Sequence, residues 1–185
     1  MTPKVIIDCD PGHDDAIAIM MAGRLTEILG ITTVSGNAPL SLTTENALIM
    51  TELLGLDVDV HAGADTPLLV APTHAAEAHG RTGLDGPVRP EITLGVASND
   101  AVAFIIETVR SNDDVWLVPI GPLTNIALAV RQAPDIVDRV AGISIMGGSA
   151  GAGNVTATAE FTLWADPHAA SIVFDAGFKK LLMAG

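Results

Sequence analysis

Short β-branched runs alternate along the chain with longer segments in which apolar residues recur at helical spacing. The short runs predict strands at residues 5–7, 28–34, 58–61, 115–120, 143–146 and 180–184. The longer segments predict helices over residues 16–22, 43–54, 98–109, 126–131 and 166–176. We expect Ser98 or Asn99 to cap the third of these helices, and Asp166 to cap the last with Pro167 in its first turn.

This alternation predicts an α/β fold. Strands separated by helices form a largely parallel, doubly wound, Rossmann-like sheet with helices on both faces, and we expect one domain over residues 1–185. Residues 62–97 interrupt the pattern with scattered Gly and Pro, and only residues 68–70 and 92–94 look ordered. A loop of this length inside a compact domain is usually functional or mobile.

Four carboxylates stand between the first strand and the first helix: Asp8, Asp10, Asp14 and Asp15. Asp14 or Asp15 can cap the helix, which explains one acid but not four. Crowded carboxylates repel one another unless a cation or a shared proton relieves the repulsion. A hard divalent cation bound by oxygen atoms is the simplest relief, and Ca²⁺ accepts more ligands than Mg²⁺. The strand, acidic turn and helix also place these groups where open α/β sheets bind ligands.

Composition narrows the classes of partner. The net charge of −13 argues against nucleic acid and against an anionic membrane, and it favours a neutral small substrate over a phosphorylated ligand. The glycine-rich stretch at residues 147–154 matches neither G-x-G-x-x-G nor the P-loop pattern. Cys9 is the only cysteine, so no disulfide framework is expected. The start MTPK lacks the features of a signal peptide and no run is long enough to span a membrane, so we expect a cytoplasmic protein.

The acidic stretch DCDPGHDDAIAI resembles the N-terminal signature of the nucleoside hydrolase family, the inosine-uridine-preferring type, written D-x-D-P-G-x-D-D-A-x-A-I. The resemblance implies the nucleoside hydrolase fold, calcium-dependent hydrolysis of the N-glycosidic bond of ribonucleosides, and a homodimer or homotetramer. It implies that Asp10 and Asp15 bind Ca²⁺, that Asp10 also takes a proton from the attacking water, and that Asp14 contacts the ribose. The stretch GPLTN resembles another family motif, which implies that the backbone carbonyl of Ile120 is a further calcium ligand.

Other family motifs imply substrate contacts. The pattern V-x-G-N assigns one to Asn37, and H-x-H-G-x-(S/T)-G assigns a contact near the sugar or base to His79. The M-G-G and G-N-x-x-x-x-A-E-F-N passages imply that Met146 lies under the sugar and that Asn154 and Glu160 bind its 5′-hydroxyl end. Without the resemblance, Asn37 is equally an ordinary turn residue, His79 a solvated loop histidine, and the glycine-rich stretch a flexible loop.

The chain departs from the family pattern at Thr162, where the family has an Asn that contacts the ribose hydroxyls. If nothing compensates, the loss of such a hydrogen bond costs on the order of 1 to 3 kcal/mol. His168 replaces a family Glu on the first turn of the last helix, which we interpret as a surface change. The family's chains run beyond residue 185, where the resemblance implies an Asp that completes the calcium shell and a His that acts as leaving-group acid. We therefore expect weak or absent nucleoside hydrolysis from residues 1–185 alone.

Two other classes of function remain open at this stage. The pair Asp8 and Asp10 follows a strand as the D-x-D of haloacid dehalogenase-type phosphohydrolases does, although Gly12 departs from that pattern and Asp14 and Asp15 are then unexplained. A catalytically impaired calcium- or ribose-binding module is favoured by Thr162.

Overall fold

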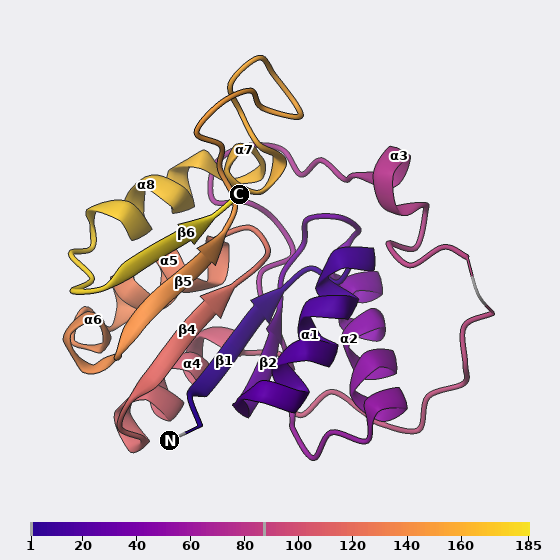
Figure 1. Cartoon of the computed structure of the whole chain (residues 1–185), viewed down its shortest axis with the longest axis horizontal. Helices are drawn as coiled ribbons and strands as arrows, with labels where there is room; N and C mark the ends of the chain where they lie inside the picture. The colour runs from indigo at the N-terminus through magenta and orange to yellow at the C-terminus, as the bar shows by residue number, and fades with distance from the viewer. Residues whose placement is uncertain (1, 87) are drawn as a thin grey trace.

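The structure, a computed structural model, describes residues 2–86 and 88–185. Within this part of the chain, six parallel strands form one sheet in the order β3-β2-β1-β4-β5-β6 (Figure 1). The order turns back at β1, so the chain first builds one half of the sheet and then the other. The strands are β1 (Lys4–Cys9), β2 (Glu27–Thr33), β3 (Val60–Ala62), β4 (Val115–Pro119), β5 (Gly142–Met146) and β6 (Leu181–Ala184).

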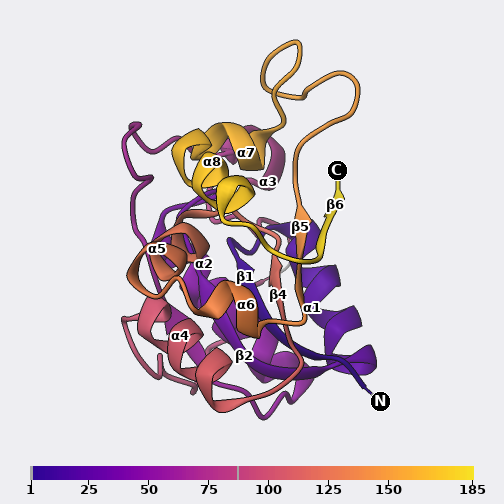
Figure 2. The same cartoon turned by 90° about the vertical axis from the view of Figure 1, so that its left-hand side faces the viewer.

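Helices cover both faces of the sheet, which confirms the doubly wound architecture. Two of them pack against one face of the β1–β3 half, and the other face is covered by a second group of helices (Figures 1 and 2). The first group is α1 (His13–Leu25) and α2 (Leu40–Leu54). The second is α4 (Ala101–Ser111), α5 (Thr124–Gln132), α6 (Ile136–Arg139) and α8 (Pro167–Asp175), and the short helices α3 (Ala76–His79) and α7 (Phe161–Ala165) lie in loops.

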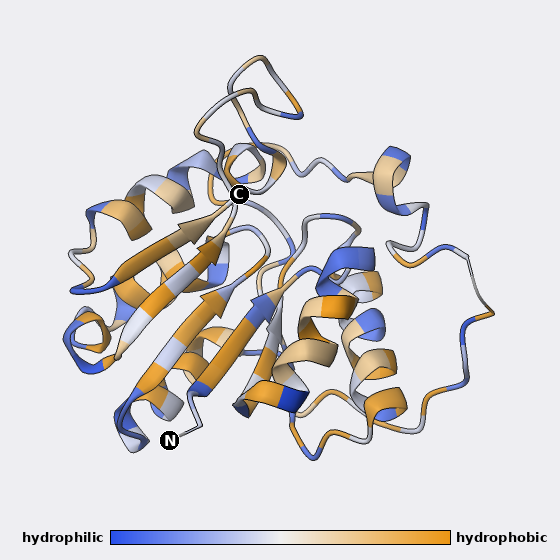
Figure 3. Cartoon of the chain, in the orientation of Figure 1, coloured by the Kyte–Doolittle hydropathy of each residue, from blue (hydrophilic) through white to orange (hydrophobic). Residues whose placement is uncertain are grey.

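The central strand β1 contains the continuous apolar run Val5–Ile7 because both of its faces are buried. Val5 and Ile7 belong to the core beneath α1 and α2, whereas Ile6 belongs to the core beneath α4, α5 and α8. Successive side chains of a strand point to opposite faces, so a continuous Val-Ile-Ile run fills two cores at once. The concentration of hydrophobic residues in β1 and β4 is visible in Figure 3.

Several element boundaries differ from the sequence prediction. Helix α2 begins at Leu40, directly after Pro39, three residues earlier than expected. The cap of α4 is Asp100, whose side chain accepts a hydrogen bond from the Ala103 amide, so the assignment of the cap to Ser98 or Asn99 was wrong. The hydroxyl of Ser98 instead accepts a hydrogen bond from the Asp100 amide.

Short structures were also missed, since four or five residues are too few to show a helical period. Helices α3, α6 and α7 were not expected, and residues 68–70 and 92–94 form neither strand nor helix. Glu52 of α2 holds the second of these segments through the amides of Thr93 and Leu94. Helix α8 was predicted correctly, with Asp166 as its cap and Pro167 in its first turn. Among the described residues, no helix is long and apolar enough to cross a membrane.

Candidate active site

The polar segments that follow β1, β2, β4 and β5 meet at the carboxyl edge of the sheet. They line a cavity of about 890 Å³ together with the loops that carry α3 and α7. Nearly every residue implied in catalysis or in substrate contact by the sequence lies on its wall, and only the expected metal ligand Asp15 does not. The residues concerned are Asp10, Asp14, Asn37, His79, Ile120, Met146, Asn154, Glu160 and Thr162.

Asn37 connects the two carboxylates at the centre of this edge. Its backbone amide donates to Asp10 Oδ2 at 2.6 Å, and its side-chain amide donates to the Asp10 carbonyl at 3.0 Å and to Asp15 Oδ2 at 3.4 Å. Asp15 also accepts a hydrogen bond from the Gly12 amide at 3.0 Å, so it does cap α1. Its other oxygen, Oδ1, is buried without a hydrogen-bond partner. Helix capping therefore accounts for one oxygen of Asp15 and leaves the second unexplained.

Burial makes the charges of these carboxylates unfavourable in the protein alone. Both Asp10 and Asp15 are 2% exposed. Burial, and to a lesser extent the nearby charge of Asp14, raise the pKa of Asp15 to about 7, although the hydrogen bond from the Gly12 amide acts in the opposite direction. Burial and the charge of Asp15 raise the pKa of Asp10 well above its ordinary value. Two ionised side chains in this place require a positive partner.

The groups that surround the pair fit a hard divalent cation. Gly36 and Gly121 lie directly against the Asp10 carboxylate, and a Cβ atom on Gly121 would stand 2.6 Å from Asp10 Oδ1. In residues 2–86 and 88–185, no third acidic, imidazole or thiol side chain joins the pair to form a closed metal cluster. The candidate donors are the two carboxylates and the Ile120 carbonyl that the sequence resemblance implies, and all of them are oxygen atoms. Such a set suits Ca²⁺, with further positions left for water or substrate.

Residues 72–86 fold back over the cavity, although they were expected to be largely irregular. His79 ends α3 with its side chain 19% exposed, and its Nδ1 lies 3.9 Å from Asp14 Oδ1. The backbone amide of His13 donates to the same Nδ1 at 3.4 Å, and the two imidazole rings are stacked with centroids 5.6 Å apart. His74 Nδ1 lies 3.0 Å from the Gly36 carbonyl oxygen. His79 therefore contacts the turn that carries the acidic residues, and His74 contacts the turn after β2.

The opposite wall of the cavity is the loop between β5 and α7. Glu160 caps α7, because its carboxylate accepts hydrogen bonds from the amides of Thr162 at 2.8 Å and Leu163 at 3.3 Å. The same carboxylate also accepts a hydrogen bond from the Gly148 amide at 2.7 Å. Asn154 Oδ1 accepts from the Phe161 amide at 2.8 Å. Asn154 and Glu160 thus each accept a hydrogen bond from the backbone. The interpretation of this stretch as merely a flexible loop is therefore incomplete.

Sequence reasoning missed two aromatic residues of this wall. Phe161 and Trp164 line the cavity, and their rings lie 6.4 Å apart. Aromatic residues make up only 3% of the chain, so two of them beside Glu160 were a signal that could have been used.

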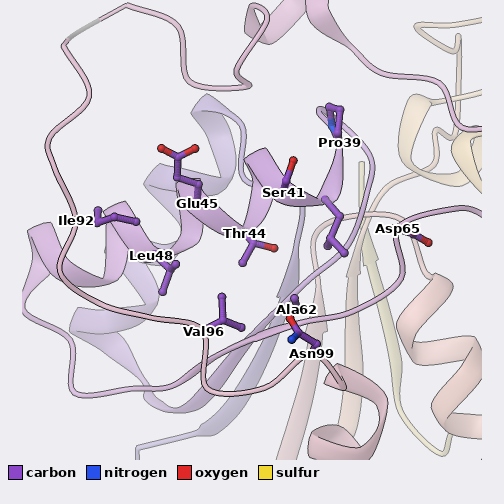
Figure 4. Close-up of a pocket in the computed structure, with 11 residues that line it drawn as sticks. Pro39, Ser41, Thr44, Glu45, Leu48, Ala62, Asp65, Ile92, Val96 and Asn99 are labelled. Carbon is purple, nitrogen blue, oxygen red and sulfur yellow. The ribbon is translucent and has the colours of Figure 1, made fainter.

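A second hollow, of about 640 Å³, lies between α2 and the loop that precedes α4 (Figure 4). Ser41, Thr44 and Glu45 of α2 line this hollow together with Ile92 and Val96 of that loop, and all five are labelled in Figure 4. The Thr44 hydroxyl already forms a hydrogen bond with Thr33 at 2.8 Å. The candidate catalytic and substrate-binding residues therefore lie at the cavity on the carboxyl edge of the sheet and not at this second hollow.

The fold and this cavity together define an α/β protein whose ligand site lies at the carboxyl edge of a parallel sheet and is built around buried carboxylates. The chain belongs to the inosine-uridine preferring nucleoside hydrolase family, whose sequence profile matches residues 5–185. This confirms the resemblance found in the sequence and gives no support to the haloacid dehalogenase-type alternative.

Named relatives agree with this assignment. The pyrimidine-specific ribonucleoside hydrolase RihB of Escherichia coli K12 is 47% identical over 183 residues, which cover 97% of this chain and 58% of the relative. The purine-preferring ribonucleoside hydrolase of Gardnerella vaginalis superposes with a TM-score of 0.91 at 34% identity, covering 97% of this chain and 60% of that one. A plant nucleoside hydrolase superposes with a TM-score of 0.92 at 36% identity, covering 100% and 60%. The chain thus spans about three fifths of the length of these relatives.

Proposed function

We propose that this chain carries the calcium and ribose site of a ribonucleoside N-ribohydrolase. The reaction is hydrolysis of the N-glycosidic bond, which releases ribose and the free base. The observation that carries the proposal is the pair Asp10 and Asp15, buried at the edge of the cavity, with Asp15 Oδ1 lacking a partner. A divalent cation supplies the positive charge that the pair requires.

In this proposal, the side chains around the cavity divide the work. Asp10, Asp15 and the Ile120 carbonyl hold the cation, and Asp10 accepts the proton of the attacking water. Bound calcium would hold the ribose diol and favour ionisation of that water. Asp14, Asn37 and Thr162 position the ribose, whose oxocarbenium-like transition state is stabilised by the anionic surroundings. Asn154 and Glu160 bind its 5′-hydroxyl end, Met146 lies under the sugar, and His79 closes the cavity near the sugar or base.

The leaving base is not assigned, because the relatives' names differ on it: RihB is called pyrimidine-specific and the Gardnerella enzyme purine-preferring. We propose that the partner is a ribonucleoside and that the protein is a cytoplasmic homodimer or homotetramer with a single α/β domain over these residues. Size-exclusion chromatography with light scattering tests the assembly.

The function is tested by release of free base from uridine and inosine by the purified chain, with calcium and with a chelator. Calcium-dependent release, reduced by Asp10→Asn at least about 10²-fold, is the expected signature of the site. For residues 1–185 alone the expected turnover is weak. Tight ribose binding without base release would instead favour the catalytically impaired calcium- or ribose-binding module. Absence of both calcium binding and ribose binding would overturn the proposal.

A further inference from the structure

Asn125, the second residue of α5, occupies an unusual place behind the cavity. Its side chain is fully buried and does not line the cavity, so it does not meet a bound substrate. Its Nδ2 donates to Asp8 Oδ1 at 2.8 Å and to the Thr33 carbonyl at 3.0 Å. Its Oδ1 accepts from the Ala64 amide at 2.8 Å. One side chain therefore joins α5 to the ends of β1 and β2 and to the segment after β3.

The same Asp8 is attached to the turn that precedes α5. Its backbone carbonyl accepts hydrogen bonds from the amides of Ile120 at 2.8 Å and Gly121 at 3.3 Å. Its carboxylate accepts hydrogen bonds from the side-chain amide of Asn125 on α5 and from the Thr32 hydroxyl on β2. The turn between β4 and α5 is thus fixed to β1 at two points, one through the backbone and one through Asn125.

This attachment sets the relative position of the atoms proposed to bind the cation. Asp10 lies two residues after Asp8, and the Ile120 carbonyl lies in the attached turn. Asp10 and Ile120 are far apart in the sequence, so contacts between the two elements must set the distance between their oxygen atoms. A rotation of α5 would move the carbonyl of Ile120 away from Asp10. The hydrogen bonds between these elements oppose it, together with the packing of α5 in the core. Asn125 is paired at both its Oδ1 and its Nδ2, whereas Asp8 Oδ2 is buried without a hydrogen-bond partner. Within a buried network, a side chain that is paired at both ends fixes the geometry of the groups it joins.

We propose that Asn125 is a positioning residue of the cation site: it holds the Ile120 carbonyl in register with Asp10 and Asp15. The inference rests on the proposed function and deepens it. The packing around the residue is consistent with this role, since a Cβ atom on Gly63 would overlap the amide group of Asn125. The segment after β3 is therefore shaped to admit this side chain.

Asn125→Ser removes the reach to Asp8 and Ala64 and is expected to weaken calcium binding at least about tenfold, the usual effect of losing a group that orients a metal ligand. Gly63→Ala tests the same inference independently, because the added methyl group displaces the Asn125 side chain while the amide of Asn125 is kept. It is expected to weaken calcium binding in the same direction. If Asn125→Ser fails to fold, Gly63→Ala still decides the matter.

The neighbouring Thr124 supplies a matched control. It is also buried at the start of α5, but its hydroxyl donates to Asp166 Oδ2 at 2.8 Å, away from the cation site. Thr124→Val loses a buried hydrogen bond and should lower the unfolding midpoint while calcium affinity stays unchanged. A purely structural role of Asn125 would predict the same behaviour for both variants.

The measurement is calorimetric titration of the full chain with Ca²⁺, with unfolding midpoints recorded on the same samples. Weaker binding in Asn125→Ser and Gly63→Ala, but not in Thr124→Val, supports the inference. Unchanged affinity in the first two variants, or an equal loss in all three, overturns it while the proposed function stands. Failure of the unmodified chain to bind calcium overturns the cation site of the proposed function and this inference with it.

Discussion

At the scale of single residues, the site consists of side chains whose charges are unfavourable where the fold places them. Asp8, Asp10 and Asp15 are each at most 2% exposed. Nothing in an isolated strand or helix requires this, since the same carboxylates would be solvated in a short peptide. The fold therefore holds these acids buried at a cost in stability that a bound cation can offset at Asp10 and Asp15.

The raised pKa values predict how stability depends on pH in the absence of calcium. Burial raises the pKa of Asp8 and of Asp15 from 3.8 to about 7, so the folded chain binds more protons than the unfolded chain between these values. The free energy of unfolding should therefore fall as pH rises through this window, by on the order of 4 kcal/mol per group at most. Urea unfolding at a series of pH values with chelator measures it.

Asp15→Asn is the informative variant for this prediction, because an amide does not titrate and should make the profile flatter. Calcium, which is proposed to favour the ionised carboxylate, should flatten the profile of the unmodified chain as well. A calcium-free stability that rises between pH 4 and 7 would contradict the prediction.

Thr162 stands where the sequence resemblance implies an Asn that contacts the ribose hydroxyls, and it is 4% exposed at the cavity wall. Thr162→Asn restores a longer side chain with an amide donor toward the proposed ribose site. We expect the KM for a nucleoside to fall by about tenfold, the value of one hydrogen bond. Thr162→Val is the control and should raise KM. Steady-state kinetics decide between them, and an unchanged KM for Thr162→Asn would show that another group already binds the hydroxyls.

At the scale of elements, the turns after the strands determine how closely the chain approaches the carboxylates. Gly36 follows β2 and Gly121 follows β4, and both lie against the Asp10 side chain. A side chain at either position would occupy the space of the carboxylate. The glycines are therefore required by close approach of the backbone.

Gly36→Ala is expected to displace Asp10 and to lower calcium affinity by about tenfold or more, while the sheet remains intact. Gly95→Ala is the control, since a Cβ atom there meets nothing within 4 Å. Calcium titration and circular dichroism on both variants provide the comparison. Equal affinities would show that the turn can shift without disturbing the site.

At the scale of the whole molecule, the two halves of the sheet are covered unequally. Figure 2 shows α4, α5, α6 and α8 on one side of β5 and β6, whereas α1, on the other side, lies further along the sheet. Leu182, on the edge strand β6, is 56% exposed and Met183 is 52% exposed. An open strand edge with exposed apolar side chains is prone to association.

Residues 1–185 alone are therefore expected to associate as concentration rises, and Leu182→Lys should reduce this association. Leu69→Lys is the matched control, because Leu69 is equally an exposed leucine but lies in a loop away from the strand edge. Light scattering over a concentration series measures the effect. Equal scattering from both variants would show that the edge strand is not the contact.

The sequence by itself determined the alternation of strands and helices, the parallel sheet and the turns that carry the site. These follow from local periodicity: the Val-Ile-Ile run of β1 and the Asp166-Pro167 start of α8 contain their own signals. The sequence also placed Asp10 and Asn37 after strands and Ile120 at the end of one, and parallel strands bring such positions to one edge. Short elements such as α3, α6 and α7 carried no usable period and were missed.

Only the tertiary structure decided which side chains meet and which are left without partners. The contact between Asn125 and Asp8 spans 117 positions, and that between His13 and His79 spans 66. Contacts between residues so far apart in the sequence cannot be predicted from local spacing. Burial, which raises the pKa of Asp15 and leaves its Oδ1 unpaired, is likewise a property of the packed sheet and helices. Local chemistry set the elements, whereas the distances and the dielectric surroundings that give the carboxylates their role arise only when distant segments pack together.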